Sequence, residues 1–205
     1  MRSTFLAEPD IEGLAPRAAA KARRRVDLLR ASAKIMADTG FHAMRLEDLG
    51  EAVGISGPAV YRHFSSKEQI LRELLLGIST HLNSQAREVI DGAATPQERV
   101  STLIDFHISF ALHQPELIRL HNRELFRLGM DGHAQVRHAQ GQYLQLWAQC
   151  LQLLDPALDD DGAKVKAQLI IGLINSVEYL RLNVPRSVVR RQMSESARAV
   201  AGLST

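Results

Sequence analysis

The stretch from Arg45 to Lys67 constrains the fold more than any other part of the 205-residue chain. Its sequence, RLEDLGEAVGISGPAVYRHFSSK, holds two short apolar patterns with helical spacing on either side of Gly54. Ser56 followed by Pro58 is typical of a helix start, because a serine oxygen can accept from free amides and proline has no N–H to satisfy. The stretch therefore predicts two short helices joined by a tight turn.

The second of these helices, predicted over residues 57–64, has an outer surface that suits DNA. Val60 and Phe64 are four residues apart and form its buried face. The residues left outward are Gly57, Ala59, Tyr61, Arg62 and His63. Because small residues let the backbone come close and polar residues can contact bases, this surface favours entry into a DNA major groove.

Several motifs in this region resemble the signature of TetR-type transcriptional regulators, over about residues 24 to 75. They are Gly40-Phe41, Leu46-Glu47-Asp48-Leu49, Ala52-Val53-Gly54-Ile55-Ser56, Val60-Tyr61-Arg62-His63-Phe64 and Ser66-Lys67-Glu68. Two positions depart from the family pattern. Arg45 stands where a serine or threonine usually caps the first motif helix, and Gly50 stands where alanine is usual. We expect both to weaken that helix, with Gly50 costing up to roughly 1 kcal/mol relative to alanine.

The resemblance implies an all-α fold, with an N-terminal three-helix helix-turn-helix DNA-binding domain followed by a larger helical ligand-binding and dimerisation domain. The apolar periodicity agrees, because no alternating strand pattern is present. Besides the two motif helices, helices are predicted over residues 23–39, 66–90, 96–113, 115–128, 133–154, 163–183 and 185–201. We expect a flexible N-terminal arm over residues 1–20, the DNA-binding domain over 21–67 and the effector-binding and dimerisation domain over 68–205.

Composition excludes several classes of protein. The single cysteine, Cys150, rules out a disulfide framework or a cysteine metal cluster within one chain. No apolar run resembles a signal peptide or reaches the ~20 residues of a membrane span, so we expect a cytoplasmic protein that does not associate with a membrane. The net charge is only +2, but residues 17–34 hold seven bases against one acid, Asp27. Ahead of a helix-turn-helix, this cluster favours contact with DNA phosphates, although alone it would equally fit a solvated helix start.

The residues expected to contact DNA are Arg23, Arg24, Arg25, Leu46, Ser56, Gly57, Ala59, Tyr61, Arg62, His63 and Lys67. Direct base contact is assigned to Gly57, Ala59 and Arg62, with Ser56 as a further candidate. The resemblance assigns phosphate contact to Tyr61, His63 and Lys67. The three consecutive arginines are expected to hold flanking backbone or a minor groove, and the helix that starts near Leu46 to offer an amide to a phosphate. Alternatively, Tyr61 packs against the first helix, and Arg62 and His63 merely face solvent.

The helix predicted over residues 163–183 is apolar around more than one face. A surface helix of a monomer needs an apolar face of only about 100°. This helix therefore either packs against a second subunit or lies fully enclosed in the centre of the chain. The resemblance implies dimerisation through the last two long helices, so we predict a homodimer built on residues 163–201 that binds a palindromic operator.

The resemblance also implies that the C-terminal helices bind a small effector, which makes the protein a ligand-responsive repressor. The candidate effector-binding residues are polar or aromatic groups among apolar ones: His107, His121, Arg123, Glu124, Arg127, Tyr143, Trp147, Asn175 and Glu178. An apolar lining with several arginines suits a hydrophobic carboxylate or phosphate. Because residues 137–147 loosely resemble acyl-CoA-responsive regulators, we expect an acyl-CoA-like effector ahead of a drug-like or aromatic one.

The competing interpretation is an all-helical metal- or cofactor-binding enzyme. His121 and Glu124 have the i, i+3 spacing that helix-bundle metal proteins use. A di-iron bundle needs two such pairs with further carboxylates, and the sequence has no second pair. It also lacks a nucleophile elbow, a phosphate-binding loop and a zinc signature. We therefore expect no catalytic activity, no metal and no cofactor.

Overall fold

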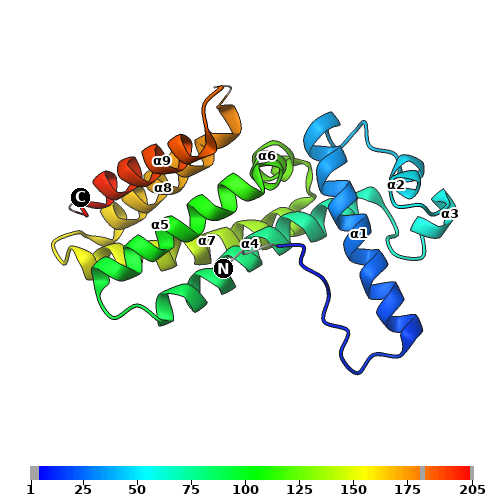
Figure 1. The fold of residues 1–205 in the computed structure, drawn as a ribbon, viewed down its shortest axis with the longest axis horizontal. Coiled ribbons are helices and arrows are strands. Elements are labelled where there is room, and N and C mark those ends of the chain that lie inside the picture. The colour runs from blue at the N-terminus through cyan, green and yellow to red at the C-terminus, as the bar shows by residue number, and fades with distance from the viewer. Residues whose placement is uncertain (1–4, 181–182, 204–205) are drawn as a thin grey trace. The chain divides into compact units, whose positions relative to one another are not determined.

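A computed structural model describes residues 5–180 and 183–203 as an all-helical chain, which confirms the predicted class (Figure 1). The helices are α1 Pro16–Thr39, α2 Leu46–Ala52, α3 Gly57–Val60, α4 Lys67–Asp91, α5 Pro96–His113, α6 Pro115–Glu124, α7 Met130–Leu154, α8 Asp160–Asn175 and α9 Arg186–Ala201, with 3₁₀ turns η1 Leu125–Arg127 and η2 Ser176–Tyr179. In the described residues, none of these helices has both the length and the apolar character needed to cross a membrane.

The chain divides into two compact units. The N-terminal unit consists of the described part of residues 4–78 together with residues 119–136. The C-terminal unit consists of residues 79–118 and the described part of 137–205. Helices α4, α6 and α7 each contribute residues to both units. The predicted domain boundary after residue 67 stays a prediction.

Within the N-terminal unit, α2 and α3 form the expected helix-turn-helix beside α1. Val60 and Phe64 are both buried, as their spacing predicts, and Gly54 makes the turn with a φ of 72°, a conformation that glycine adopts without strain. The second helix is shorter than predicted. Only residues 57–60 are α-helical, because the amides of Arg62 and His63 bond three residues back to make a tighter turn.

Several helix ends differ from the sequence prediction. Helix α1 begins at Pro16, seven residues before the predicted start, because proline suits the first helical turn and alanines follow it. Helix α7 begins at Met130, three residues before the predicted start at residue 133, so Gly132 lies inside a helix. Helix α8 ends at Asn175 and tightens into η2, where a helix was predicted to continue to residue 183. Ser176 donates its hydroxyl hydrogen to the Leu173 carbonyl there, which competes with helix continuation.

In the C-terminal unit, α5 packs against α8 and α9, and α8 lies beside α9 (Figure 1). Helix α5 starts with a capping box in which Thr95 and Glu98 satisfy each other's amides. Helix α8 buries one face, formed by Ala163, Ala167, Ile170 and Ile174. On its other side Val165 and Leu169 are each 60% exposed. Within one chain α8 is therefore not enclosed, which contradicts the alternative of a central helix.

Gly50 has a packing role that the sequence did not indicate. A Cβ atom at this position would lie 2.8 Å from the carbonyl oxygen of Ile55 and 3.1 Å from the amide nitrogen of Gly57. The Gly50 carbonyl also accepts a hydrogen bond from the Ile55 amide at 2.9 Å. The absence of a side chain thus lets the turn close onto α2, and the expectation that glycine simply weakens this helix is wrong.

We predict that Gly50→Ala lowers the free energy of unfolding by about 1–3 kcal/mol, because the added methyl overpacks the turn against rigid backbone. Gly141→Ala is the matched control, since Gly141 is an exposed residue of α7 with nothing within 4 Å of its Cβ position. The control should raise the free energy of unfolding by up to about 1 kcal/mol. Urea denaturation followed by circular dichroism measures both values, and equal stabilisation by the two changes would contradict the packing role.

Candidate functional site

The outward side of α3 and of the turn after it forms an exposed surface with the expected residues. Tyr61 is 56% exposed and Arg62 is also exposed, so both side chains are accessible to a partner. Ser56 occupies the N-cap position, yet its side chain makes no capping hydrogen bond, contrary to the expectation for a serine before proline. Ala59 is half-buried, and Gly57 faces Glu47 of α2, whose Cγ would lie 3.3 Å from a Cβ. Gly57 therefore also permits close packing of the two motif helices.

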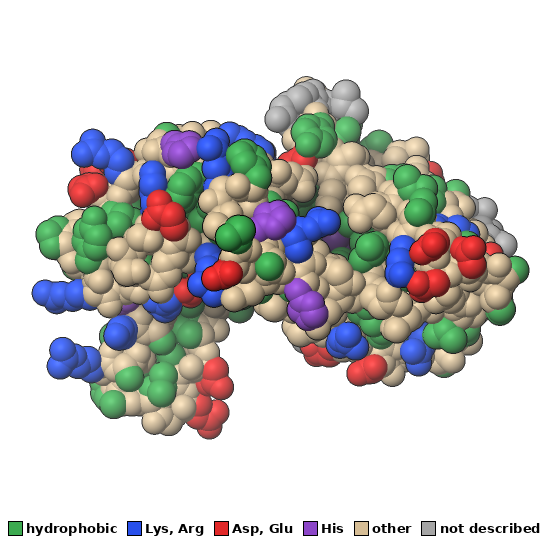
Figure 2. Space-filling view, turned by 180° about the vertical axis from the view of Figure 1, so that it is seen from behind, with side chains coloured by type: hydrophobic (Ala, Val, Ile, Leu, Met, Phe, Trp, Pro, Cys, Tyr) green, Lys and Arg blue, Asp and Glu red, His purple; other side chains and the backbone are tan. Residues whose placement is uncertain are grey.

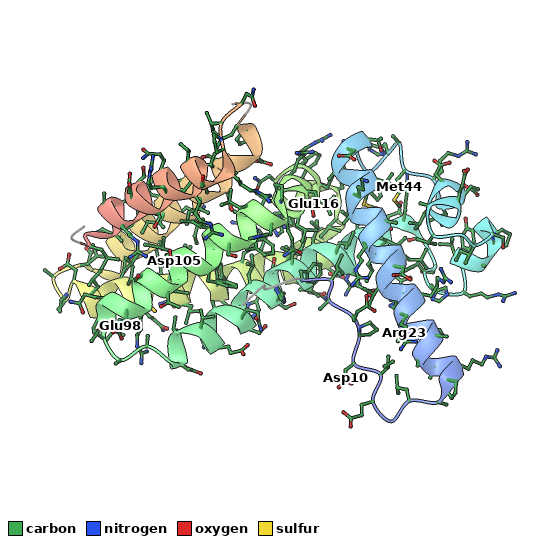
Figure 3. The ribbon with its side chains drawn as sticks, viewed as in Figure 1. Asp10, Arg23, Met44, Glu98, Asp105 and Glu116 are labelled. Carbon is green, nitrogen blue, oxygen red and sulfur yellow. The ribbon has the colours of Figure 1, made fainter. Side chains whose placement is uncertain are left out.

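The three consecutive arginines of α1 have different surroundings. Arg23 is exposed and projects from the N-terminal half of α1 (Figure 3). Arg24 is half-buried and donates to the Val53 carbonyl at 2.7 Å, which ties α1 to the end of α2. Lysine and arginine side chains are prominent on the N-terminal unit, at the left of Figure 2. This surface has the charge needed to attract DNA phosphates.

Arg25 is held entirely by groups of the N-terminal unit. Its Nε lies 3.2 Å and one terminal nitrogen 2.5 Å from the two carboxylate oxygens of Glu73 on α4. Its other terminal nitrogen donates to the main-chain carbonyl of His63, and the guanidinium lies 4.1 Å from the centre of the Phe64 ring. The planar group thus joins α1, α4 and the end of the helix-turn-helix.

Lys67, the first residue of α4, also has partners inside the protein. Its ammonium donates to the carbonyls of Phe41 at 3.3 Å and of His42 at 3.2 Å, and lies 4.7 Å from the centre of the Phe41 ring. Contact of Lys67 with phosphate stays a prediction, and the structure shows a second role, which is to hold the turn between α1 and α2.

His63 lies in a region of positive potential. Burial lowers the pKa of its imidazole, and the nearby charges of Lys21, Arg25 and Arg24 lower that pKa further. Its Nδ1 is buried and has no hydrogen-bond partner among the described residues. A potential that disfavours an added positive charge favours a negative one, so the surroundings of His63 suit a phosphate.

The start of α2 is less suited to an anion than expected. Leu46 is buried, and the side chain of Arg45, at the N-cap position, makes no capping hydrogen bond. The first turn contains Glu47 and Asp48, which stabilise the positive end of the helix dipole but repel a phosphate. The predicted contact between the Leu46 region and phosphate is therefore opposed by two local charges.

The predicted effector residues divide between the two units. His107, Tyr143, Trp147, Asn175 and Glu178 belong to the C-terminal unit, and the structure brings the first four together. His121, Arg123, Glu124 and Arg127 belong to the N-terminal unit.

The four that come together form a buried, uncharged polar cluster. The Nδ1 of His107 lies 2.9 Å from the Tyr143 hydroxyl, and its Nε2 lies 3.0 Å from Asn175 Oδ1. Since that amide oxygen can only accept, we assign the imidazole hydrogen to Nε2, so that Nδ1 accepts from Tyr143. Trp147 is fully buried and meets the rings of His107 and Tyr143 edge-on, with centroids 6.2 and 6.3 Å away.

The ionisation of the cluster follows from its burial. Burial lowers the pKa of His107 to about 4, and the hydrogen bond that its imidazole donates to Asn175 only partly opposes this. Burial raises the pKa of the Tyr143 hydroxyl; the Trp147 N–H opposes the increase, although it makes no hydrogen bond of ordinary geometry. Near pH 7 the cluster therefore carries no charge. Glu178, in η2, is also buried.

The predicted effector residues of the N-terminal unit contact the C-terminal end of α1. Arg123 donates to the Ala37 carbonyl at 3.2 Å, and Glu124 accepts from the Phe41 amide at 3.3 Å. Arg127 lies 3.7 Å from the buried carboxylate of Glu124. Helix α6 and η1 thus cap the end of α1, which the spacing of these residues in the sequence could not reveal.

The His121–Glu124 pair considered for metal binding is not part of a larger ligand set. Across the described residues, no group of three or more histidine, cysteine, aspartate or glutamate side chains could hold a metal ion.

The sequence did not indicate Glu73 as a partner of Arg25, one of the residues predicted to contact DNA. Glu73 lies 48 residues from Arg25 along the chain. No local pattern connects two residues so far apart.

The neutral state of His107 predicts a pH dependence of stability. The folded pKa of about 4 lies below the ordinary 6.5, so the imidazole takes up a proton on unfolding once the pH falls below 6.5. Its contribution to stability is present above pH 6.5 and is lost as the pH falls towards 4. Between pH 7 and pH 5 the loss should be about 2 kcal/mol. Urea denaturation of wild type and of His107→Gln, whose side chain at position 107 cannot titrate, measures the loss of unfolding free energy that comes from His107. An equal loss between pH 7 and pH 5 in both proteins would contradict the prediction.

Comparison with known proteins supports the DNA-binding assignment. Residues 28–74 match the family described as bacterial regulatory proteins, tetR family. The repressor KstR2 of Mycobacterium tuberculosis is 31% identical over 122 residues, which cover 56% of this chain and 61% of KstR2. The chain thus spans about three fifths of this curated relative.

Solved structures show the same fold over more of the chain. The structure of the ketosteroid transcriptional regulator KstR2 of M. tuberculosis matches with a TM-score of 0.70 and 25% identity, over 87% of this chain and 93% of that one. The structure of AibR in complex with isovaleryl coenzyme A and operator DNA matches with a TM-score of 0.74 and 16% identity, over 88% and 97%. The chain therefore contains, over residues 28–74, the DNA-binding domain of the tetR family of bacterial regulatory proteins, and it shares the helical fold of KstR2.

Proposed function

We propose that this protein is a transcriptional repressor that binds a palindromic operator as a homodimer and responds to a small hydrophobic effector. The observation that carries the proposal is the helix-turn-helix within residues 28–74, with the exposed outer side of α3 beside an exposed arginine, Arg23. We place its action in the cytoplasm, where its DNA target would be, and assign it no catalytic activity.

In this proposal the DNA contacts come from α3, from the residues on either side of it and from exposed Arg23 of α1. Ser56, Gly57, Ala59 and Arg62 contact base edges, while Tyr61, His63 and Arg23 contact phosphates. The exposure of Tyr61 and Arg62 and the positive potential at His63 support this division. The DNA-binding domain spans residues 21–67, and residues 68–205 provide the effector site and the dimer interface.

Arg62→Ala and Tyr61→Phe test the division of roles. The operator is first obtained by selecting duplexes from a random pool with wild-type protein. Loss of a base contact should weaken binding to the selected duplex by about 1–3 kcal/mol while leaving an unrelated duplex nearly unchanged. Loss of the Tyr61 hydroxyl should weaken binding to both duplexes alike. Fluorescence anisotropy measures both affinities, and parallel losses in Arg62→Ala would contradict base contact by Arg62.

Dimerisation through residues 163–201 is supported by apolar side chains at the surface of the C-terminal unit. Among the described residues of this range, the exposed large apolar ones are Val165, Leu169, Tyr179, Leu180, Val184 and Val200. Hydrophobic atoms are also visible on the surface of this unit at the right of Figure 2. A second copy of the same surface would remove this apolar area from water.

Leu169→Glu should convert the dimer to a monomer, because a charge would be buried in an apolar interface. Operator affinity should fall with it, since one helix-turn-helix reads a single half-site. Leu153→Glu is the matched control, as Leu153 is an exposed leucine of α7 outside residues 163–201. Light scattering at micromolar concentration measures the mass; a monomeric wild type, or a dimeric Leu169→Glu, would overturn this interface.

The effector is proposed to be acyl-CoA-like, or another hydrophobic acid, with its uncharged polar part near the His107–Tyr143–Trp147–Asn175 cluster. The isovaleryl coenzyme A bound by AibR supports this class, and the neutral state of His107 indicates that the cluster itself would recognise a carbonyl better than an anion. The arginines first expected to bind the acid, Arg123 and Arg127, contact groups of the N-terminal unit instead.

A thermal-shift screen tests the effector class. Acyl-CoA esters should raise the melting temperature of wild-type protein, and Tyr143→Phe should reduce that rise because the cluster loses a hydroxyl. Tyr61→Phe, whose hydroxyl lies in the N-terminal unit, should leave the rise unchanged. Stabilisation by short aromatic compounds with none by acyl-CoA esters would reverse the proposed class.

A further inference from the structure

We infer that Arg25 and Glu73 form a clamp that positions α3 for DNA binding, so that Arg25 acts through the protein backbone and not as a phosphate contact. Here the clamp means these two side chains together with the main-chain carbonyl of His63. The inference rests on the proposed DNA-binding function and concerns a residue that sequence reasoning assigned to DNA itself.

Three of the five N–H groups of the Arg25 side chain have partners inside the N-terminal unit. Its Nε and one terminal nitrogen bind the two oxygens of Glu73 side by side, the paired geometry in which arginine binds carboxylate most strongly. Its remaining terminal nitrogen donates to the His63 carbonyl. One face of the group lies over the Phe64 ring. The side chains of Arg25 and Glu73 are only 33% and 37% exposed.

The reading helix needs such support because it is only one turn long. An isolated helix of four residues cannot stabilise itself. The carbonyls of Ala59 and Val60 accept from amides of the turn that follows α3, and this turn ends near the His63 carbonyl that Arg25 binds. The carbonyl that Arg25 binds belongs to His63, directly after Tyr61 and Arg62 in the chain. Holding this carbonyl therefore fixes the direction in which those two side chains leave the protein.

The charge of Glu73 provides a test, because two explanations predict opposite changes in DNA affinity when that charge is removed. Glu73 is an anion in the unit that binds DNA, so removing its charge should strengthen DNA binding if only long-range electrostatics matters. If Glu73 instead orients Arg25, the same change should weaken binding, since a guanidinium that loses its carboxylate partner no longer holds the His63 carbonyl in place.

The experiment uses the full-length protein and the duplex that wild type selects from a random pool. Wild type, Glu73→Gln, Arg25→Ala and Arg23→Ala are titrated against this duplex over a series of KCl concentrations. Glu73→Gln and Arg25→Ala should each lose about tenfold or more in affinity, because a hydrogen bond to a charged group is lost. The salt slope, which is the slope of log affinity against log KCl concentration, should stay unchanged in both. Arg23→Ala, at an exposed neighbour, should reduce the salt slope by about 1.

In these titrations, two outcomes would overturn the clamp. One is unchanged or increased affinity in Glu73→Gln, and the other is a loss of salt slope in Arg25→Ala that equals the loss in Arg23→Ala. Thermal denaturation of each variant, with affinities compared at a temperature where all are folded, separates positioning from unfolding.

A charge-exchanged double variant, Arg25→Glu with Glu73→Arg, tests the role of the backbone carbonyl. It can form the ion pair again, but a glutamate at position 25 cannot donate to the His63 carbonyl. Its melting temperature should exceed that of Arg25→Ala while its operator affinity stays low; restored affinity would overturn the clamp. If wild type itself selects no duplex, the proposed DNA-binding function fails, which is distinct from failure of the clamp.

Discussion

The N-terminal unit depends on the anchoring of a helix too short to orient itself. Helix α3 has a single turn, so its direction is set by Val60 and Phe64 in the core and by contacts at its two ends. At one end Gly57 packs on Glu47, and at the other Arg25 binds the His63 carbonyl. Because packed contacts cost energy to shift by even a fraction of an ångström, this anchoring can present a DNA-reading surface of defined geometry.

The C-terminal unit contains a different kind of constraint. His107, Tyr143 and Asn175 form hydrogen bonds with one another in a region where each unpaired polar group would cost on the order of 1–3 kcal/mol. The cluster joins α5, α7 and the end of α8. A ligand that exchanged hydrogen bonds with this cluster would alter the packing of these three helices. One of them, α7, has residues in both units.

Much of the fold could be predicted from local patterns. The helix over residues 96–113 matches α5 at both ends, because Thr95, Pro96 and Gln114-Pro115 are strong local signals. The start of α1 at Pro16 was missed because the residue before the proline, Ala15, cannot cap a helix with its side chain. The beginning of α7 at Met130 and the end of α8 have no comparable local signal. The gathering of His107, Tyr143, Trp147 and Asn175 was foreseen only as a set of candidates, and the separation of Arg123, Glu124 and Arg127 from them was not foreseen.

Local chemistry was sufficient to identify the helix-turn-helix, its buried Val60 and Phe64 and its outward Tyr61 and Arg62, because these follow from spacing along one short segment. The partners of Arg25 and the need for glycine at position 50 depend on contacts made after the chain has folded. Arg25 carries the same charge as exposed Arg23, and the two differ in their tertiary surroundings, in which Arg25 meets Glu73 and the His63 carbonyl. A sequence lists charges in order along the chain, whereas their roles depend on distances in space.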